Sequence, residues 1–197
     1  MRPLKFGIGQ PHIRVEDPPL LTGKGRFVAD LIPEGALRGV FVRSPHAHAR
    51  FRFTDLNTAR NMPGVRLILT HDDVAHLAPF PCLGALIIHL HKGPHVWVPP
   101  FLVLPKDTVK HVGEEVAFVV ADTVEQARDA AEAVGIEWEP LPAVVDVREA
   151  LKSDAPVLWP EHGSNRAFTL ELGDKEATEK AFASAHRVVK LDVVNQR

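Results

Sequence analysis

The chain has 197 residues, of which 45% are hydrophobic and 24% charged, and its formal net charge is −2. This length suits one domain or a domain with an extension, and the composition is that of an ordinary globular protein. The charge excludes a basic field for holding a nucleic-acid backbone, and the sequence has no apolar run of about eighteen residues that would predict a membrane span.

Two features of the sequence bear on the cellular compartment. The first nineteen residues contain no apolar core of the kind that a signal peptide needs. The lone cysteine, Cys82, excludes an intrachain disulfide and is typical of a reducing environment. We therefore expect a cytoplasmic protein that is not exported.

The N-terminal half predicts short elements separated by proline and glycine. Residues 1–19 are expected to form an irregular arm, because four prolines interrupt regular structure there. Residues 78–105 are rich in proline and predict a long loop with a short hairpin at 86–90. Patterning predicts, between these two stretches, a strand at 37–43, extended structure at 49–53, a helical turn at 55–60, a strand at 65–70 and a helix at 72–74 capped by Thr70 or His71.

A strand–helix–strand unit is the clearest pattern in the chain. The apolar run 116–120 predicts a central strand buried on both faces. Apolar residues at helical spacing then predict a helix over 124–134, with Thr123 and Gln126 as a capping box and Gly135 as the C-terminal cap. Residues 136–139 alternate as the second strand.

The C-terminal quarter predicts one more helix and one more strand. Gly173-Asp174 introduces a helix whose apolar face carries Ala177, Ala181, Phe182 and Ala185. The chain then alternates between apolar and charged residues over 189–193, which predicts a last strand. Because no partner for this strand is evident, we expect a truncated or split protein.

Two pairs of histidines have the spacing of metal ligands, namely His46 with His48 and His89 with His91, and His95 lies close to the second pair. On a strand each pair would share a face and could reach one zinc ion. The sequence has neither a cysteine pair nor an HExxH helix to support a metal, which favours imidazoles bonded to loop backbone. We interpret Ser44–Arg50 as a structural turn that holds no metal.

The other candidate sites are also weak. Gly7-Ile8-Gly9 and Thr22-Gly23-Lys24-Gly25 lack the remaining residues of nucleotide-binding motifs and predict tight turns. Cys82 is expected to be inert rather than nucleophilic, and Glu114 and Glu115 to lie at a solvated turn rather than act as general bases. The tryptophans are too scattered in sequence for a base-stacking platform: Trp97, Trp138 and Trp159. We predict no catalytic, cofactor-binding or metal-ligating residue in this chain.

Seven short segments follow one another in an order that is more specific than any one of them: residues 14–17, 21–30, 43–50, 63–65, 69–73, 111–121 and 134–146. This succession resembles the N-terminal part of the large, molybdenum-binding subunit of the xanthine dehydrogenase/aldehyde oxidase family. It looks most like the branch that includes the aerobic carbon monoxide dehydrogenase large chain. The resemblance covers residues 14–77 and 105–197, and 78–104 depart from the family pattern.

The resemblance implies an α+β fold. It places an α/β-hammerhead domain with a mixed sheet and short helices at 20–145, and the opening segment of a molybdenum-binding domain at 146–197. In the family, a molybdenum–pterin cofactor hydroxylates a carbon centre with oxygen from water, and electrons pass to iron–sulfur clusters and FAD on partner chains or domains. Val112-Gly113-Glu114 mimics the motif around the family's general base, but it lies in the hammerhead and does not inherit that role.

The main hypothesis is that the chain is the hammerhead portion or subunit of a molybdenum hydroxylase and is not catalytic alone. The resemblance implies as partners the remaining molybdenum-binding domains, an iron–sulfur subunit and a flavin subunit. The alternative is a free-standing interaction module that has lost the enzyme context and uses its proline-rich loop to bind a partner. A histidine-based metalloenzyme is the third hypothesis and the weakest.

Overall fold

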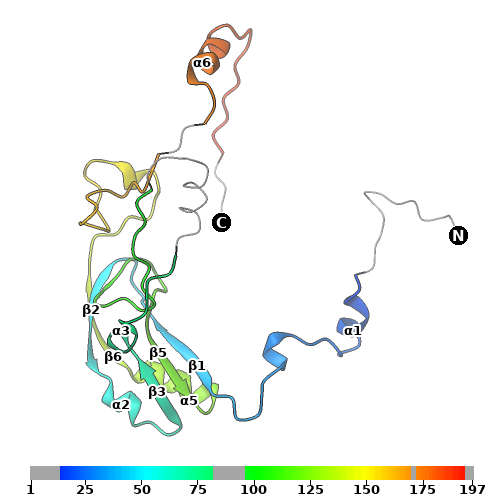
Figure 1. Ribbon diagram of the computed structural model, residues 1–197, viewed down its shortest axis with the longest axis vertical. Helices are drawn as coiled ribbons and strands as arrows, with labels where there is room; N and C mark the ends of the chain where they lie inside the picture. Colours follow the sequence, from blue (N-terminus) through cyan, green and yellow to red (C-terminus); the bar gives the residue numbers. More distant parts are fainter. Residues whose placement is uncertain (1–13, 82–95, 170–171, 194–197) are drawn as a thin grey trace, which may run out of the picture. The chain divides into compact units, whose positions relative to one another are not determined.

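The computed structural model describes residues 14–81, 96–169 and 172–193 (Figure 1). The chain divides into two units that interleave in sequence. Unit 1 contains the residues up to Arg43, Arg52–Thr70 and Glu115–Glu137, and unit 2 contains Ser44–Phe51, His71–Glu114 and the residues from Trp138 onward.

Unit 1 is built on a three-stranded antiparallel sheet with the order β1–β5–β3. The strands are β1 (Arg38–Arg43), β5 (Glu115–Ala121) and β3 (Val65–Leu69). The apolar run therefore forms the central strand, as predicted. Its burial is uneven, since Val119 is fully buried while Phe118 and Val120 are half-buried, so the expectation of burial on both faces holds only in part.

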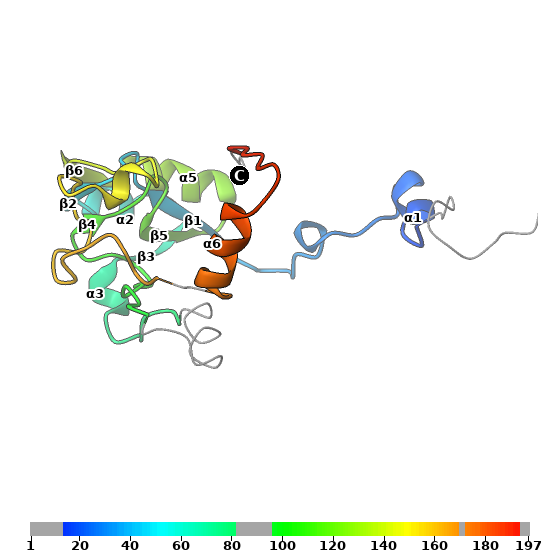
Figure 2. The ribbon, with the colours of Figure 1, turned by 90° about the horizontal axis from the view of Figure 1, so that it is seen from above.

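Helix α5 (Val124–Ala133) covers one face of this sheet and lies against β1 and β5 (Figure 2). Its predicted capping box is confirmed: Gln126 N–H donates to Thr123 Oγ1 at 3.2 Å, and Thr123 N–H donates to Gln126 Oε1 at 3.0 Å. These bonds satisfy two of the N–H groups that a helix start leaves unpaired.

The predicted cap at the other end of α5 is wrong. The helix ends at Ala133, Val134 is extended, and Gly135 is the first residue of strand β6 (Gly135–Pro140). A Cβ atom at position 135 would lie 2.7 Å from Thr54 Oγ1 and 3.0 Å from the Asp55 nitrogen, both in β2 (Ala49–Asp55). Gly135 is thus required by a close approach of two strands and not by a left-handed helix end.

The core of unit 1 lies between α5 and the sheet. Its buried members are Ala59, Ile68, Val119, Ala130 and Val134. Ala59 comes from the short helix α2 (Asn57–Arg60), so two helices contribute alanines to the core. Small side chains at these positions let the helix backbones pack close to the strands.

A second three-stranded sheet has the order β4–β2–β6, with β4 at Thr108–Val109. Two cross-strand ion pairs join β2 to β6, Arg50 with Glu139 at 3.4 Å and Arg52 with Glu137. The α+β class and the hammerhead are confirmed, but the expected mixed sheet is replaced by two small sheets in which the β1–β5, β3–β5 and β2–β4 pairs are antiparallel. Strands that follow each other along the chain, such as β1 and β2, belong to different sheets. Sequence patterning predicts the strands but not the sheet that each strand joins.

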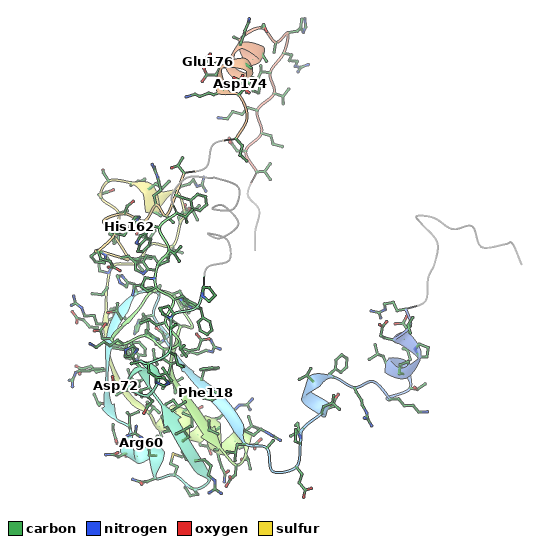
Figure 3. The ribbon with its side chains drawn as sticks, viewed as in Figure 1. Arg60, Asp72, Phe118, His162, Asp174 and Glu176 are labelled. Carbon is green, nitrogen blue, oxygen red and sulfur yellow. The ribbon has the colours of Figure 1, made fainter. Side chains whose placement is uncertain are left out.

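The remaining described elements are short. They are α1 (Asp17–Leu21), η1 (Val28–Asp30), α3 (His71–Val74), η2 (Glu149–Leu151) and α6 (Lys175–Ala183). The predicted helix α6 is confirmed, and Asp174 Oδ1 caps it by accepting from Ala177 N–H at 2.9 Å (Figure 3). Across the described ranges, no helix is long and apolar enough to cross a membrane.

Two sequence predictions fail at the ends of the chain. The arm is not irregular throughout, because Pro18 and Pro19 open helix α1, where their missing N–H groups cost nothing. Residues 189–193 form no strand in the part of the chain that the structure describes. Alternation specifies which face a strand would bury, but a strand forms only where a second strand accepts its hydrogen bonds.

An ion pair at the edge of unit 1 makes a testable contribution to acid stability. Arg66 Nε and Nη2 donate to the two carboxylate oxygens of Asp122 at 2.8 and 2.9 Å. These hydrogen bonds, with the charge of Arg66, hold the pKa of Asp122 below its ordinary value. A lowered pKa in the folded state stabilises the fold above the ordinary aspartate pKa, and this contribution is lost as the pH falls through the folded value.

We therefore expect Asp122→Asn to lower the free energy of unfolding at pH 7, and we expect this difference to shrink as the pH falls through the lowered folded pKa of Asp122, below which both side chains are neutral. Urea titrations of both proteins at several pH values measure this difference. A difference that stays constant as the pH is lowered from 7 through the acid range would show that the ion pair does not contribute through the charge of Asp122.

Candidate functional site

The predicted turn lies at Ser44–His48, between β1 and β2, and Ala49 and Arg50 are the first residues of β2. Ser44 is only 3% exposed, and its Oγ donates to the His46 carbonyl at 2.8 Å and accepts from His46 N–H at 3.0 Å. Its backbone bonds to a second loop, because Ser44 N–H donates to the Glu114 carbonyl and Gly113 N–H donates to the Ser44 carbonyl. The turn is therefore held by hydrogen bonds within itself and by backbone hydrogen bonds to the loop that contains Gly113 and Glu114.

The two histidines of this turn have protein partners. The His46 ring meets the edge of the Trp138 ring at a centroid distance of 5.6 Å. His48 Nδ1 lies 2.8 Å from the Pro142 carbonyl oxygen and must carry the proton, since a carbonyl only accepts. Both residues precede β2, so the shared strand face on which the metal hypothesis depends does not exist for this pair.

Metal ligation finds no support elsewhere in the described ranges, where no group of three or more His, Cys, Asp or Glu side chains could hold a metal ion. His89, His91, His95 and Cys82 lie outside the described residues, as does Gly7-Ile8-Gly9. Gly23 has the predicted turn geometry, with φ at 69° and its N–H donating to the Leu20 carbonyl.

The adjacent glutamates have different surroundings, and the expectation of a solvated turn is wrong for one of them. The Glu114 side chain is only 15% exposed, and its Oε2 accepts from Lys110 N–H at 2.5 Å and lies 3.5 Å from His111 Nδ1. Glu115 forms an ion pair with Arg43 at 2.6 Å in unit 1. Because the Glu114 carboxylate is bound to backbone, it orders its own loop.

Unit 2 contains an aromatic cluster that sequence separation conceals. The Trp97 ring stacks on His162 at a centroid distance of 4.1 Å and meets Trp159 edge-on at 5.7 Å. Trp97 N–H donates to the Ala167 carbonyl, and His162, labelled in Figure 3, bonds to the Arg166 carbonyl through Nε2 at 2.9 Å. Trp97 and Trp159 are far apart in sequence but contact each other, whereas Trp138 lies apart, against Phe51.

A hollow of ≈ 630 Å³ in unit 2 lies beside this cluster and is lined by Trp159, His48 and Glu114. Its charges balance, with three basic side chains, Arg50, Lys106 and Lys110, and three acidic ones, Asp107, Glu114 and Glu161. Four prolines complete much of the wall: Pro99, Pro100, Pro105 and Pro160.

This hollow does not fit the phosphate-bearing molybdenum–pterin cofactor that the resemblance implies. An anion of that kind needs an excess of positive charge or converging backbone N–H groups, whereas the charges of this lining balance and its four prolines lack an N–H. The polar side chains described in this region, Ser44, His48 and Glu114, bond to backbone and hold turns and loops in place.

Residues 22–142 match the family described as "Aldehyde oxidase and xanthine dehydrogenase, a/b hammerhead domain". The carbon monoxide dehydrogenase large chain of Afipia carboxidovorans is 39% identical over 196 residues, which cover 93% of this chain and 23% of that protein. The nicotine 6-hydroxylase large subunit of Paenarthrobacter nicotinovorans is 36% identical, over 92% of this chain and 21% of its own length. The chain therefore spans less than a quarter of these relatives, and the expected likeness to the carbon monoxide dehydrogenase large chain is confirmed.

Solved structures of enzymes of this kind also superpose on the chain. A crystal structure of the Cu,Mo-CO dehydrogenase superposes with a TM-score of 0.73 at 36% identity, over 92% of this chain and 23% of that one. The aldehyde oxidoreductase from Desulfovibrio gigas superposes with a TM-score of 0.68 at 28% identity, over 88% of this chain and 19% of that one.

Proposed function

The chain belongs to the aldehyde oxidase and xanthine dehydrogenase family, and from this premise we propose that it is the hammerhead portion of a molybdenum hydroxylase large subunit. Its work is to pack against the cofactor-binding remainder of the enzyme and against an iron–sulfur partner, and it is not catalytic alone. The cofactor, the iron–sulfur clusters and the flavin then belong to other domains or chains.

Exposed apolar surface is the observation that carries this proposal. In unit 2, Val145 and Val147 are more than four-fifths exposed, and Leu172 is 87% exposed. In unit 1, the segment that precedes β1 exposes Leu21 and Val28 to a similar degree. Soluble monomers rarely expose apolar side chains of this size in groups, and such groups mark surfaces that a partner covers.

We also propose a division of the chain into an arm at 1–19, a hammerhead domain at 20–145 and the opening of a molybdenum-binding domain at 146–197, and the family match over 22–142 supports the middle part. The described part of 146–193 contains no buried residue, so it has no core of its own. We propose that this last segment completes its core by packing against the rest of a molybdenum hydroxylase large subunit.

Purification from the native host by an affinity tag on this chain tests the proposed function. We expect two or three companion chains by mass spectrometry, together with molybdenum and iron by elemental analysis. The same purification from untagged cells is the control for adventitious metal. A single metal-free species would contradict the proposal and would favour the free-standing interaction module.

A further inference from the structure

Residues 146–168, here called the joint, follow the part of the chain that matches the hammerhead family, 22–142. No residue of the joint is buried, so a hydrophobic core does not order it. A segment with few buried apolar contacts opens easily and behaves as a flexible linker unless other interactions hold it. In the joint, two sets of side-chain contacts hold the backbone in one conformation.

The first set of contacts belongs to the half-buried side chain of Asn165. Its Nδ2 donates to the Ala150 carbonyl at 3.1 Å and to the Pro156 carbonyl at 2.9 Å, and its Oδ1 accepts from Leu158 N–H at 3.1 Å. Both donors of the amide are therefore used, together with one lone pair of its oxygen. One side chain thus fixes three backbone positions that lie between seven and fifteen residues away along the chain.

The second set attaches the joint to the hammerhead part of unit 2. Trp97 lies within the matched residues, and its ring stacks on His162 at a centroid distance of 4.1 Å with 8° between the ring planes (Figure 3). Its backbone N–H donates to the Ala167 carbonyl at 3.1 Å, and Lys110 Nζ lies 5.8 Å from the centre of the Trp159 ring. Stacked rings and a cation over an aromatic face attract each other without full burial.

We propose that Asn165 and Trp97 are positioning residues that make the joint rigid and so fix the direction in which the chain leaves the hammerhead domain. This inference rests on the proposed function, in which residues from 146 onward open a molybdenum-binding domain. A connection that is already ordered loses less conformational entropy on assembly, which strengthens association with the rest of the enzyme. Asn165 orders the joint within itself, and Trp97 attaches it to the hammerhead.

Limited trypsin digestion of the full chain tests whether the joint is rigid, and it needs no partner. Trypsin sites are exposed in the joint at Arg148 and Lys152 and in helix α5 at Arg128. Because a protease cuts a locally opened chain, each rate reports the opening of its own region. We expect Asn165→Asp to accelerate both cuts in the joint by about tenfold or more, since a carboxylate keeps the volume of the amide but has no N–H to donate. The rate at Arg128 should stay unchanged.

Three further variants separate the joint from general stability. Trp97→Ala removes the stack and is expected to accelerate the same two cuts, whereas Trp97→Phe keeps an aromatic ring and restores most of the protection. Asn61→Asp makes the same chemical change at an exposed position directly after α2, in unit 1, and is the matched control. It should change the rate in neither region.

The proposal is overturned if Asn165→Asp or Trp97→Ala leaves the cuts in the joint unchanged, or if either variant accelerates the cut at Arg128 equally. Recovery of companion chains by the tagged protein is the second readout, and it should fall several-fold in Asn165→Asp relative to Asn61→Asp. Equal recovery would overturn the positioning role even if the cuts accelerate. If the unmodified chain recovers no companion, the proposed function fails, and the digestion still decides whether the joint is rigid.

Discussion

Replacement of Val119 by aspartate is expected to leave the protein unable to fold. Val119 is fully buried at the centre of β5, where it pairs with Val40 of β1 and Ile68 of β3 and packs in the core with Ala130. A carboxylate there finds no described basic group among the core residues, and it must be buried as a charge or be protonated.

The expected loss of stability in Val119→Asp exceeds about 4 kcal/mol, the range of buried unpaired charges. Since the whole stability of a domain is about 5–15 kcal/mol, little or no cooperative unfolding should remain. Circular dichroism recorded during heating shows whether a cooperative unfolding transition remains. Val119→Ala, which leaves only a cavity, should remain folded and lose about 2–3 kcal/mol.

The control for Val119→Asp is Leu67→Asp on the neighbouring strand. Leu67 is 46% exposed on the face of the sheet that α5 does not cover, so its carboxylate stays in water. We expect a loss of about 1 kcal/mol or less. If Val119→Asp melted like Leu67→Asp, the assignment of Val119 to the core would be wrong.

Gly64→Ala is expected to cost about 2 kcal/mol, through two effects that can be separated. Gly64 has φ at 79°, a left-handed conformation that a Cβ atom disfavours. An added Cβ would also lie 2.3 Å from Gln126 Oε1, so the Gln126 side chain must leave the capping box of α5. Each effect contributes about 1 kcal/mol.

A double-mutant cycle with Gln126→Ala tests this coupling. Without Gln126, only the backbone strain is left for Gly64→Ala, so its cost should fall to about 1 kcal/mol. Gly113→Ala is the strain-only control, since φ is 84° there and no atom lies within 4 Å of the added Cβ. Urea unfolding measures all four proteins of the cycle, and costs that simply add would disprove contact between position 64 and the cap.

The elements that sequence predicts correctly are those whose causes are local. Residues Thr123 and Gln126 reach each other across one helical turn, and the apolar run of β5 carries its own signal for a buried strand. The turn at Ser44–His48 is equally local, because Pro45 cannot continue a strand and Ser44 bonds to the backbone two residues on.

The predictions that failed concern groups brought together from distant parts of the chain. Gly135 resembles a helix cap in sequence, but it is required by the approach of Thr54 and Asp55. The stacking of Trp97 on His162 likewise joins two loops that are far apart in sequence.

By itself, the sequence determined the strand–helix–strand unit, because periodicity and caps are properties of neighbouring residues. The order of its motifs carried the resemblance to the family, and the α+β class followed from that resemblance. Only the tertiary structure decided that the strands form two sheets, and that Val188–Val193 stays unpaired within the described chain. The physical reason is that a strand carries only half of each hydrogen bond that defines it, and the other half comes from a segment that its own sequence does not specify.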